Sequence, residues 1–188
     1  MDTSFWEERT MKPSDSSARK FDAKKLKLLH GIEWALAIGL LIFLLFRFVI
    51  GFSVVSGVSM RPTLTDGEPV LYTRIYGELN RGDIVSVRIP SGEYYVKRVV
   101  ALGGDTVDLR DGILYVNGEP ESGYSFAGQT LAEDGAFTYP YVIEEGSIFV
   151  LGDNREESID SRSFGAVKAD QVKGVLKLCI ASGIHSVE

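Results

Sequence analysis

A long apolar run near the N-terminus, residues 31–55, constrains this chain more than any other feature. It reads GIEWALAIGLLIFLLFRFVIGFSVV. The 19 residues from Trp34 to Phe52 would span about 28 Å as an α-helix, close to the roughly 30 Å thickness of the hydrocarbon core of a membrane. A stretch of this length and composition must be shielded from water, either by the rest of the protein or by lipid.

Three interpretations of this run are open. A buried helix of a soluble core rarely continues so far without a polar face. A cleaved signal peptide has a shorter apolar region, of about 7 to 15 residues. A single membrane-spanning anchor fits the length best, although Arg47 must then reach the interface or find a partner. We therefore expect one N-terminal transmembrane helix over residues 31–55.

The residues before the run predict its orientation. Residues 1–30 are polar, carry both signs of charge and lack a sustained apolar period, so we expect a mobile tail. Their last twelve, RKFDAKKLKLLH, contain five Lys and Arg residues against one Asp. Basic residues beside a span stay on the cytoplasmic side. The pattern predicts a single-pass protein of the cell membrane with a basic cytoplasmic tail, in contact with the lipid bilayer, and with residues 56–188 outside the cytoplasm.

Residues 56–188 have the pattern of a β-rich domain. Short runs dense in Val, Ile, Tyr and Leu are separated by turns that contain Gly and Asp, such as Asp111-Gly112 and Asn117-Gly118. Residues 119–145 are predicted to form a long excursion between strands. The expected fold is mainly β, an antiparallel sheet or open barrel preceded by the single helix. Strands are expected within residues 69–76, 83–89, 93–102, 106–118, 147–153 and 173–181.

Composition excludes several classes of function. The chain has 188 residues, room for one ordinary domain with appendages. Its net charge of −6 argues against nucleic acid as a partner. One cysteine rules out an intramolecular disulfide, and with only two histidines no clustered zinc motif can be written. We therefore expect no metal and no cofactor.

The stretch SGVSMRPTL, residues 56–64, places a serine directly after the apolar run. Ser and Pro favour turns, so an ordinary turn is one interpretation of Ser59. The alternative is a nucleophile whose backbone amide stabilises an oxyanion, because small residues around it let a substrate approach closely. A serine nucleophile needs a base. His30 precedes the span and His185 lies three residues from the C-terminus, so lysine is the remaining base.

A candidate lysine lies in SGEYYVKRVVAL, residues 91–102. Side chains of a strand alternate between its two faces, so Lys97 and Arg98 point in opposite directions. If Lys97 faces the covered side, it shares that side with Tyr95 and Val99, and apolar surroundings disfavour its charged form. A neutral lysine can act as a general base. Two solvated basic residues on an edge strand are the alternative.

A third polar cluster is LGDNREESIDSRSFG, residues 151–165. A plain solvated loop is one interpretation of this mixture of acids, hydroxyls and arginines. A hydrogen-bonded network that holds a site rigid is the other.

Taken together, SGVSMRPTL, YYVKRVVALGGDTV and GDNREESIDSRSFG resemble the three conserved boxes of the type I signal peptidases, in order and in spacing. The resemblance covers residues from about 30 to 180, and the short linkers are similar to those of the compact Gram-positive enzymes. It implies a membrane-anchored serine endopeptidase that removes N-terminal signal peptides from exported preproteins. It also implies a β-rich domain with an apolar surface that rests on the membrane.

The resemblance assigns roles to the first two boxes. It implies that Ser59 is the nucleophile, that Lys97 is its general base through an acyl-enzyme, and that Met60 lies beside the nucleophile on the substrate side. Gly57 stands where some relatives carry a serine whose hydroxyl helps to form the oxyanion hole. The backbone amide of Ser59 is therefore expected to act there with less help.

In the third box the resemblance implies supporting roles. Ser158 corresponds to the serine that hydrogen-bonds to the lysine and orients it. Asp160 and Arg162 match an ion pair that supports the site, and Asp153 belongs to the same structural box.

Two other functions are compatible with the sequence. A related Ser/Lys protease could process a narrow set of clients. An inactive membrane-tethered module could bind signal sequences without cleaving them, although the presence of both Ser59 and Lys97 argues against it.

Overall fold

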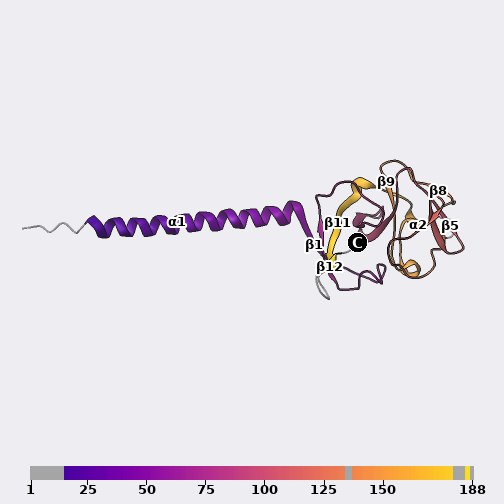
Figure 1. Cartoon of the computed structure of the whole chain (residues 1–188), viewed down its shortest axis with the longest axis horizontal. Coiled ribbons are helices and arrows are strands. Elements are labelled where there is room, and N and C mark those ends of the chain that lie inside the picture. The colour runs from indigo at the N-terminus through magenta and orange to yellow at the C-terminus, as the bar shows by residue number, and fades with distance from the viewer. Residues whose placement is uncertain (1–14, 134–136, 180–184, 187–188) are drawn as a thin grey trace, which may run out of the picture. The chain divides into compact units, whose positions relative to one another are not determined.

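The computed structural model describes residues 15–133, 137–179 and 185–186. The chain divides into two compact units, Met1–Leu44 and Leu45–Glu188. Over its described residues the first unit is one helix, whereas the second consists mainly of antiparallel strands (Figure 1). This confirms the mainly β fold class, preceded by one apolar helix, that the sequence predicts.

Helix α1 (Asp15–Leu44) begins well before the expected boundary at residue 31. Residues 15–30 are helical where a mobile tail was expected, and residues 1–14 of that tail lie outside the described residues. The reason is local. Between Pro13 and Gly31 the chain has no Pro or Gly and is rich in Ala, Leu, Lys and Arg, which favour helix, so the helix of the apolar run extends backward through them.

One stretch of the described chain, Lys24–Val49, is helical, long and apolar enough to cross a membrane. Its apolar side chains are exposed, for example Leu36 at 69% and Leu41 at 66%. A helix that is apolar on all sides requires a surrounding that is also apolar. The stretch therefore has the composition of a membrane span and not that of an amphipathic surface helix.

The sequence predicts a helix over residues 31–55, but the apolar run is helical only up to Val49. After α1, the wider π-helical turn η1 (Leu45–Val49) ends the helix, and strand β1 (Ile50–Val54) follows. β1 pairs along its whole length with β2 (Pro69–Thr73), from Ile50 opposite Thr73 to Val54 opposite Pro69. The last apolar residues are therefore part of the sheet, because a partner strand 19 residues further along the chain satisfies their backbone groups.

The larger sheet is antiparallel and has the order β1-β2-β11-β3-β4-β9-β10, with β12 beside β11. The order interleaves early and late strands, so residues far apart in sequence become neighbours. Each run of residues predicted as a strand contributes one here, except that 106–118 belongs to the second sheet. The remaining strands are β3 (Ile84–Arg88), β4 (Tyr94–Leu102), β9 (Ser147–Leu151), β10 (Val167–Lys168), β11 (Val172–Cys179) and β12 (His185–Ser186).

The smaller sheet has the order β7-β6-β5-β8. The Asp111-Gly112 turn joins β5 (Thr106–Arg110) to β6 (Ile113–Val116), and the Asn117-Gly118 turn leads into β7 (Glu119–Pro120). Both turns have positive φ at both residues, the geometry that favours tight hairpins. The excursion expected over residues 119–145 begins with β7 and returns in β8 (Tyr141–Val142).

Buried apolar side chains form the core of the β unit in three clusters. One of them, with Met60, Leu64, Tyr72, Ile84 and Leu176, lies beneath the loop that follows β1. β9 is buried along its whole length, so the third box begins at a buried strand end, and several of its polar residues are buried as well. Three short helical segments, η2 (Arg155–Glu157), α2 (Ser161–Phe164) and η3 (Ala169–Gln171), follow β9.

Candidate active site

The loop after β1 holds Ser59 in a defined position. Its neighbour Met60 is 1% exposed and packs into the core cluster beneath the loop. The backbone turns back on itself, with the Leu64 N–H donating to the Met60 carbonyl at 2.9 Å. Ser59 itself is half-buried. Ser59 therefore lies in a turn, and this turn is compatible with both interpretations of the serine.

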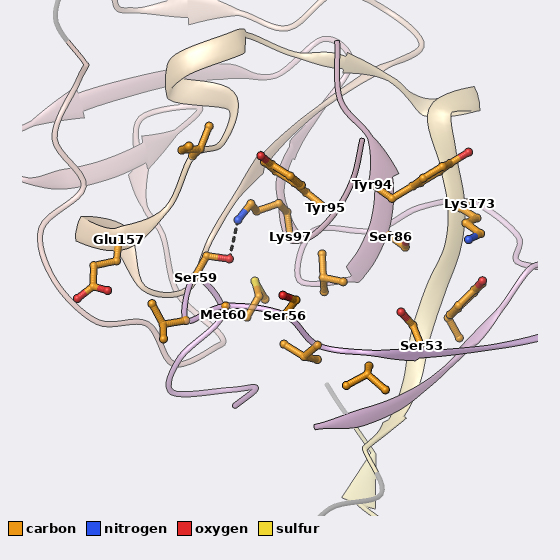
Figure 2. A pocket seen from close by; sticks show the side chains of 17 residues that line it. Ser53, Ser56, Ser59, Met60, Ser86, Tyr94, Tyr95, Lys97, Glu157 and Lys173 are labelled. Atoms are coloured by element: carbon orange, nitrogen blue, oxygen red, sulfur yellow. Dashed lines mark hydrogen bonds between the residues drawn. The ribbon is translucent and has the colours of Figure 1, made fainter. Parts of the chain in front are cut away.

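Lys97 reaches Ser59 from strand β4. Its Nζ lies 2.7 Å from the Ser59 Oγ, within hydrogen-bonding distance (Figure 2). The side chain is only 3% exposed, which excludes the interpretation of two solvated basic residues on an edge strand. β4 is an internal strand between β3 and β9, with Lys97 opposite Val85. The alternation of the strand thus directs Lys97 to the serine and Arg98 to the other face.

The surroundings of Lys97 lower its pKa, so that a larger fraction of its amine is neutral. Burial lowers the pKa of the Lys97 amine from its ordinary 10.5 to about 8. The carboxylates of Asp160 and Asp153 act in the opposite direction, because negative charge favours the ammonium form, whereas Arg162 adds to the lowering. A lysine with such a pKa is roughly one-tenth neutral at pH 7. The buried amine can therefore accept a proton near neutral pH.

Arg98 has a function that the sequence did not reveal. Its Nε and Nη2 donate to the two carboxylate oxygens of Asp153 at 2.8 and 2.7 Å. Arg98 is 1% exposed and Asp153 is fully buried. Thr63, from the serine loop, also donates to Asp153 at 2.5 Å. This fork-shaped ion pair joins β4, the third box and the serine loop.

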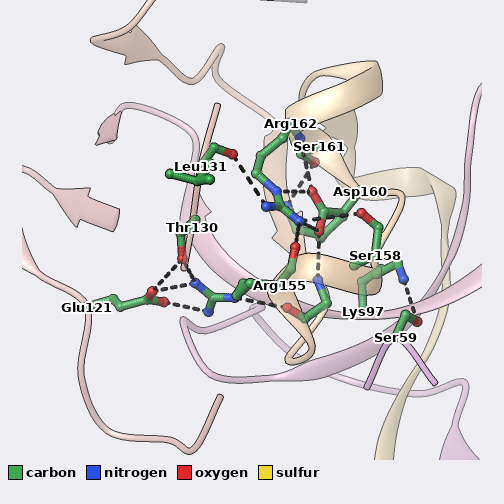
Figure 3. Close-up of polar contacts among 12 residues, drawn as sticks. Ser59, Lys97, Glu121, Thr130, Leu131, Arg155, Ser158, Asp160, Ser161 and Arg162 are labelled. Carbon is green, nitrogen blue, oxygen red and sulfur yellow. Dashed lines mark hydrogen bonds and ion pairs between the residues drawn. The ribbon is translucent and has the colours of Figure 1, made fainter. Parts of the chain in front are cut away.

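A second buried ion pair stabilises the third box. Arg162 Nε and Nη2 donate to the two oxygens of Asp160, each at 2.9 Å (Figure 3). Asp160 also caps α2 through the Arg162 N–H and accepts the Gly152 N–H at 3.1 Å. The pairing implied by the family resemblance is therefore present, and the network interpretation of this cluster holds over the solvated-loop interpretation.

The third box also contacts the backbone of the serine loop directly. The Asn154 N–H donates to the Ser59 carbonyl at 2.9 Å, and the Asn154 side chain donates to the Val58 carbonyl at 3.3 Å. Gly152 allows this approach: a Cβ at this position would lie 2.5 Å from the Ser59 carbonyl oxygen and 2.6 Å from the Ser158 Cβ. The glycine is thus required where two segments 93 residues apart meet.

Arg155 anchors the same box to residues 119–145. It pairs with Glu121 and donates to Thr130, and all three side chains are buried (Figure 3). Glu121 and Thr130 could not be recognised from the sequence, because no pattern in residues 119–145 links them to residue 155. This stretch is therefore part of the framework of the site and not only an excursion between strands.

Ser158 does not make the hydrogen bond to Lys97 that the resemblance implies. Its hydroxyl is buried beside the Lys97–Ser59 pair (Figure 3) but makes no hydrogen bond with Lys97 or any other described residue. The cause is geometric: the Ser158 Oγ lies toward Gly152, 2.2 Å from the position that a Cβ there would occupy. The hydrogen bond expected between Ser158 and Lys97 is thus not formed in this structure.

Gly57 adopts a φ of +94°, in the left-handed region that favours glycine. Its N–H donates to Asp66 Oδ1 at 2.8 Å. The Ser59 N–H, by contrast, has no hydrogen-bond partner within the described part of the chain. Of these two amides, that of Ser59 is the one available to an oxyanion.

A groove of about 380 Å³ runs along β1 and the start of β4 to Ser59 (Figure 2); we call it the Ser59 groove. Its walls combine valines and tyrosines with small serines, and two charged residues lie near its ends. They comprise Ser53, Val54, Val55, Ser56, Gly57, Val58, Ser59, Met60, Tyr72, Ser86, Tyr94, Tyr95, Val96, Lys97, Glu157, Ile159 and Lys173.

Comparisons with known proteins agree on one family. The family model described as "Signal peptidase, peptidase S26" matches residues 28–181. Signal peptidase IB of Staphylococcus aureus (strain N315) is 36% identical over 163 residues, covering 76% of this chain and 85% of the relative. Signal peptidase I of Bacillus caldolyticus is 37% identical over 164 residues, covering 80% and 90%.

A solved structure is also similar to part of this chain. The crystal structure of a signal peptidase I from Enterococcus faecalis V583 matches with 36% identity and a TM-score of 0.46, covering 54% of this chain and 98% of that one. The family model covers more than half of the chain, and both curated relatives are matched over most of their length. This chain therefore belongs to the signal peptidase family, peptidase S26.

Proposed function

We propose that this chain is a membrane-anchored serine endopeptidase that removes N-terminal signal peptides from exported preproteins, with Ser59 as nucleophile and Lys97 as general base. One observation carries the proposal: the buried Lys97 amine, with a pKa lowered to about 8, lies 2.7 Å from the Ser59 Oγ. Relatives named signal peptidase I and IB support the choice of substrate.

The proposed reaction is acyl transfer in two steps. The Ser59 Oγ attacks the carbonyl carbon of the scissile peptide bond while the neutral Lys97 amine takes the hydroxyl proton. The C–N bond then breaks, and the Lys97 ammonium gives its proton to the leaving amine of the mature protein. Water, deprotonated by Lys97, attacks the ester, which releases the signal peptide as a carboxylic acid and restores Ser59.

The remaining residues of the site have supporting roles in this proposal. The Ser59 N–H donates to the oxyanion, without help from a side chain at Gly57. The Asp160–Arg162 pair and the Arg98–Asp153 pair hold the third box against the serine loop. Met60 forms part of the groove wall beside the nucleophile.

Ser158 is proposed as a positioning residue for Lys97. Its hydroxyl is buried without a partner, and a lysine ammonium has three donors, of which Ser59 occupies one. In this role the serine would hold the protonated Lys97 in place between the two proton transfers.

Location follows from the same physical arguments. We propose that Lys24–Val49 cross the cell membrane, with the basic residues at its start on the cytoplasmic side and the β unit outside. An anchor places Ser59 ten residues beyond the end of the span. The cleavage site of a signal peptide also emerges from the bilayer, so tethering raises the local concentration of substrate. Protease protection in membrane vesicles tests this orientation.

Cleavage of a model preprotein in detergent is the decisive test. The wild-type protein should release the mature chain with a new N-terminus that mass spectrometry identifies, and Ser59→Ala and Lys97→Ala should release none. Binding of the preprotein without cleavage would support the inactive binding module instead. Cleavage of one preprotein among many would support the narrow-client protease.

A further inference from the structure

The two ends of the Ser59 groove carry opposite charges. At the end along β1, the Lys173 Nζ lies over the rings of Tyr94 and Tyr72, at 4.8 and 5.6 Å. At the other end, beyond Ser59, lies Glu157 (Figure 2). No other acidic side chain belongs to the groove lining among the described residues.

The backbone of Glu157 is tied to that of the nucleophile by hydrogen bonds. The Asn154 N–H donates to the Ser59 carbonyl at 2.9 Å, and the Glu157 N–H donates to the Asn154 carbonyl at 3.2 Å. Two successive backbone hydrogen bonds therefore connect Ser59 to Glu157. Glu157 also directly precedes Ser158, which lies beside Ser59 (Figure 3). The backbone that carries the Glu157 side chain is thus positioned by the same contacts that position the serine.

The charge of Glu157 is available to a ligand. The side chain is exposed, and its carboxylate accepts no hydrogen bond and forms no ion pair with a described residue. Other acids near the site differ in this respect: Asp153 and Asp160 are each paired with an arginine. A carboxylate that the fold leaves unpaired at the rim of a groove attracts a cationic group in whatever occupies the groove.

The polarity of the groove indicates which part of a substrate passes Glu157. The arm along β1 combines apolar side chains, such as Val55 and Val96, with the small side chains of Ser53 and Ser56. A secretory signal peptide is apolar before its cleavage site and ends in small residues, so this arm suits the signal peptide. The residues after the scissile bond then leave past Glu157. An extended chain advances about 3.3 Å per residue, so only the first few can come close to it.

We propose that Glu157 makes this enzyme select preproteins with a basic residue among the first few positions after the cleavage site. The inference rests on the proposed function and adds a preference for charge to it. Exposed ion pairs of this kind change affinity by a factor of roughly two to five. Replacing attraction by repulsion doubles that effect on the logarithmic scale, so Lys and Glu substrates should differ roughly four- to twenty-fivefold in kcat/KM.

The experiment uses the full-length enzyme in detergent and a matched set of model preproteins. The set carries Lys, Gln or Glu at one of the second to fourth positions after the cleavage site. Wild type should cleave in the order Lys, Gln, Glu at one of these positions, and high salt should reduce the ratio, because salt screens exposed charges. Glu157→Gln should bring the Lys/Glu ratio close to one, and Glu157→Lys should invert it.

Glu156→Gln is the matched control. Glu156 is exposed and next in sequence, so this variant makes the same change of charge, but Glu156 does not line the groove and packs near Gly128. It should keep the wild-type ratio. Equal kcat/KM for Lys and Glu substrates in wild type would overturn the inference, as would a ratio that persists in Glu157→Gln or disappears in Glu156→Gln. If wild type cleaves none of the set, the proposed function itself fails. Cleavage of all substrates at the same rate contradicts only the role of Glu157 and leaves the proposed function intact.

Discussion

Replacing Lys97 by arginine tests whether Lys97 acts as a general base or only supplies a positive charge. With a pKa of about 8, close to half of the Lys97 side chains are neutral at pH 8. An arginine, with a pKa above about 12, leaves fewer than roughly 1 in 10⁴ neutral at that pH. If the neutral form takes the Ser59 proton, Lys97→Arg should lower kcat/KM about 10³- to 10⁴-fold, although charge and most of the bulk are retained.

The wild-type enzyme provides the second half of this prediction. Only the neutral amine accepts a proton, so the rate should rise with pH through about 8 and level off above it. A lysine at the ordinary pKa of 10.5 would instead rise through that higher value. Between pH 7 and pH 9 the shifted pKa predicts an increase of about tenfold, from roughly 9% to 91% neutral. Cleavage of a fluorogenic preprotein peptide between pH 6 and pH 10 measures the profile.

Lys97→Met is the matched control, because it preserves the length of the side chain and fills the buried site without a base. Both variants should unfold thermally within a few degrees of wild type. The reasoning is refuted if Lys97→Arg stays folded and cleaves at more than one-tenth of the wild-type rate at pH 8, or if the wild-type profile is flat across this range.

Three further predictions follow from the contacts around the site. Arg98→Lys should lower the free energy of unfolding by about 1–3 kcal/mol in a chemical denaturation, because one ammonium cannot reproduce the fork of hydrogen bonds to buried Asp153; a variant as stable as wild type would contradict this. Ser158→Ala should lower kcat about 10²-fold and change the pH profile if the serine positions Lys97; a lowered rate with an unchanged profile would indicate a structural role only. A shortened protein that begins at Ile50 should give the circular dichroism of a β-rich fold and cleave detergent-solubilised substrate slowly. One that begins at Ser53 loses three of the five residues of β1 and should be less stable.

Arg98 shows what a local pattern leaves out. Period-two alternation predicts correctly that Lys97 and Arg98 lie on opposite faces of their strand, but it assigns no role to Arg98. The alternation could not reveal that the far face is also buried and that Asp153 lies there, 55 residues away in sequence. A long-range ion pair leaves no local pattern.

The helix boundaries have a similar explanation. Hydropathy identifies the apolar run correctly, because length and composition are local properties. Hydropathy does not distinguish a helical from an extended conformation at the end of such a run, since Ile50, Phe52 and Val54 suit both. The backbone pairing of β1 with β2 decides in favour of the strand. At the other end, helix propensity alone extends α1 back to Asp15.

The amino-acid sequence by itself predicted the longer strands of the β unit other than β1, two of its tight turns and the apolar helix, because each depends on residue types at short spacing. Ser59 and Lys97 were singled out only through the family resemblance of their two boxes, and the fold brings them to 2.7 Å. Tertiary structure alone decided the orientation of Ser158, the anchoring of Arg155 by Glu121 and the placement of Glu157 at the end of the Ser59 groove. These depend on a sheet order that interleaves early and late strands. Contacts between segments more than 90 residues apart form only when the sheet closes around its core, where burial sets both the geometry and the charge of the site.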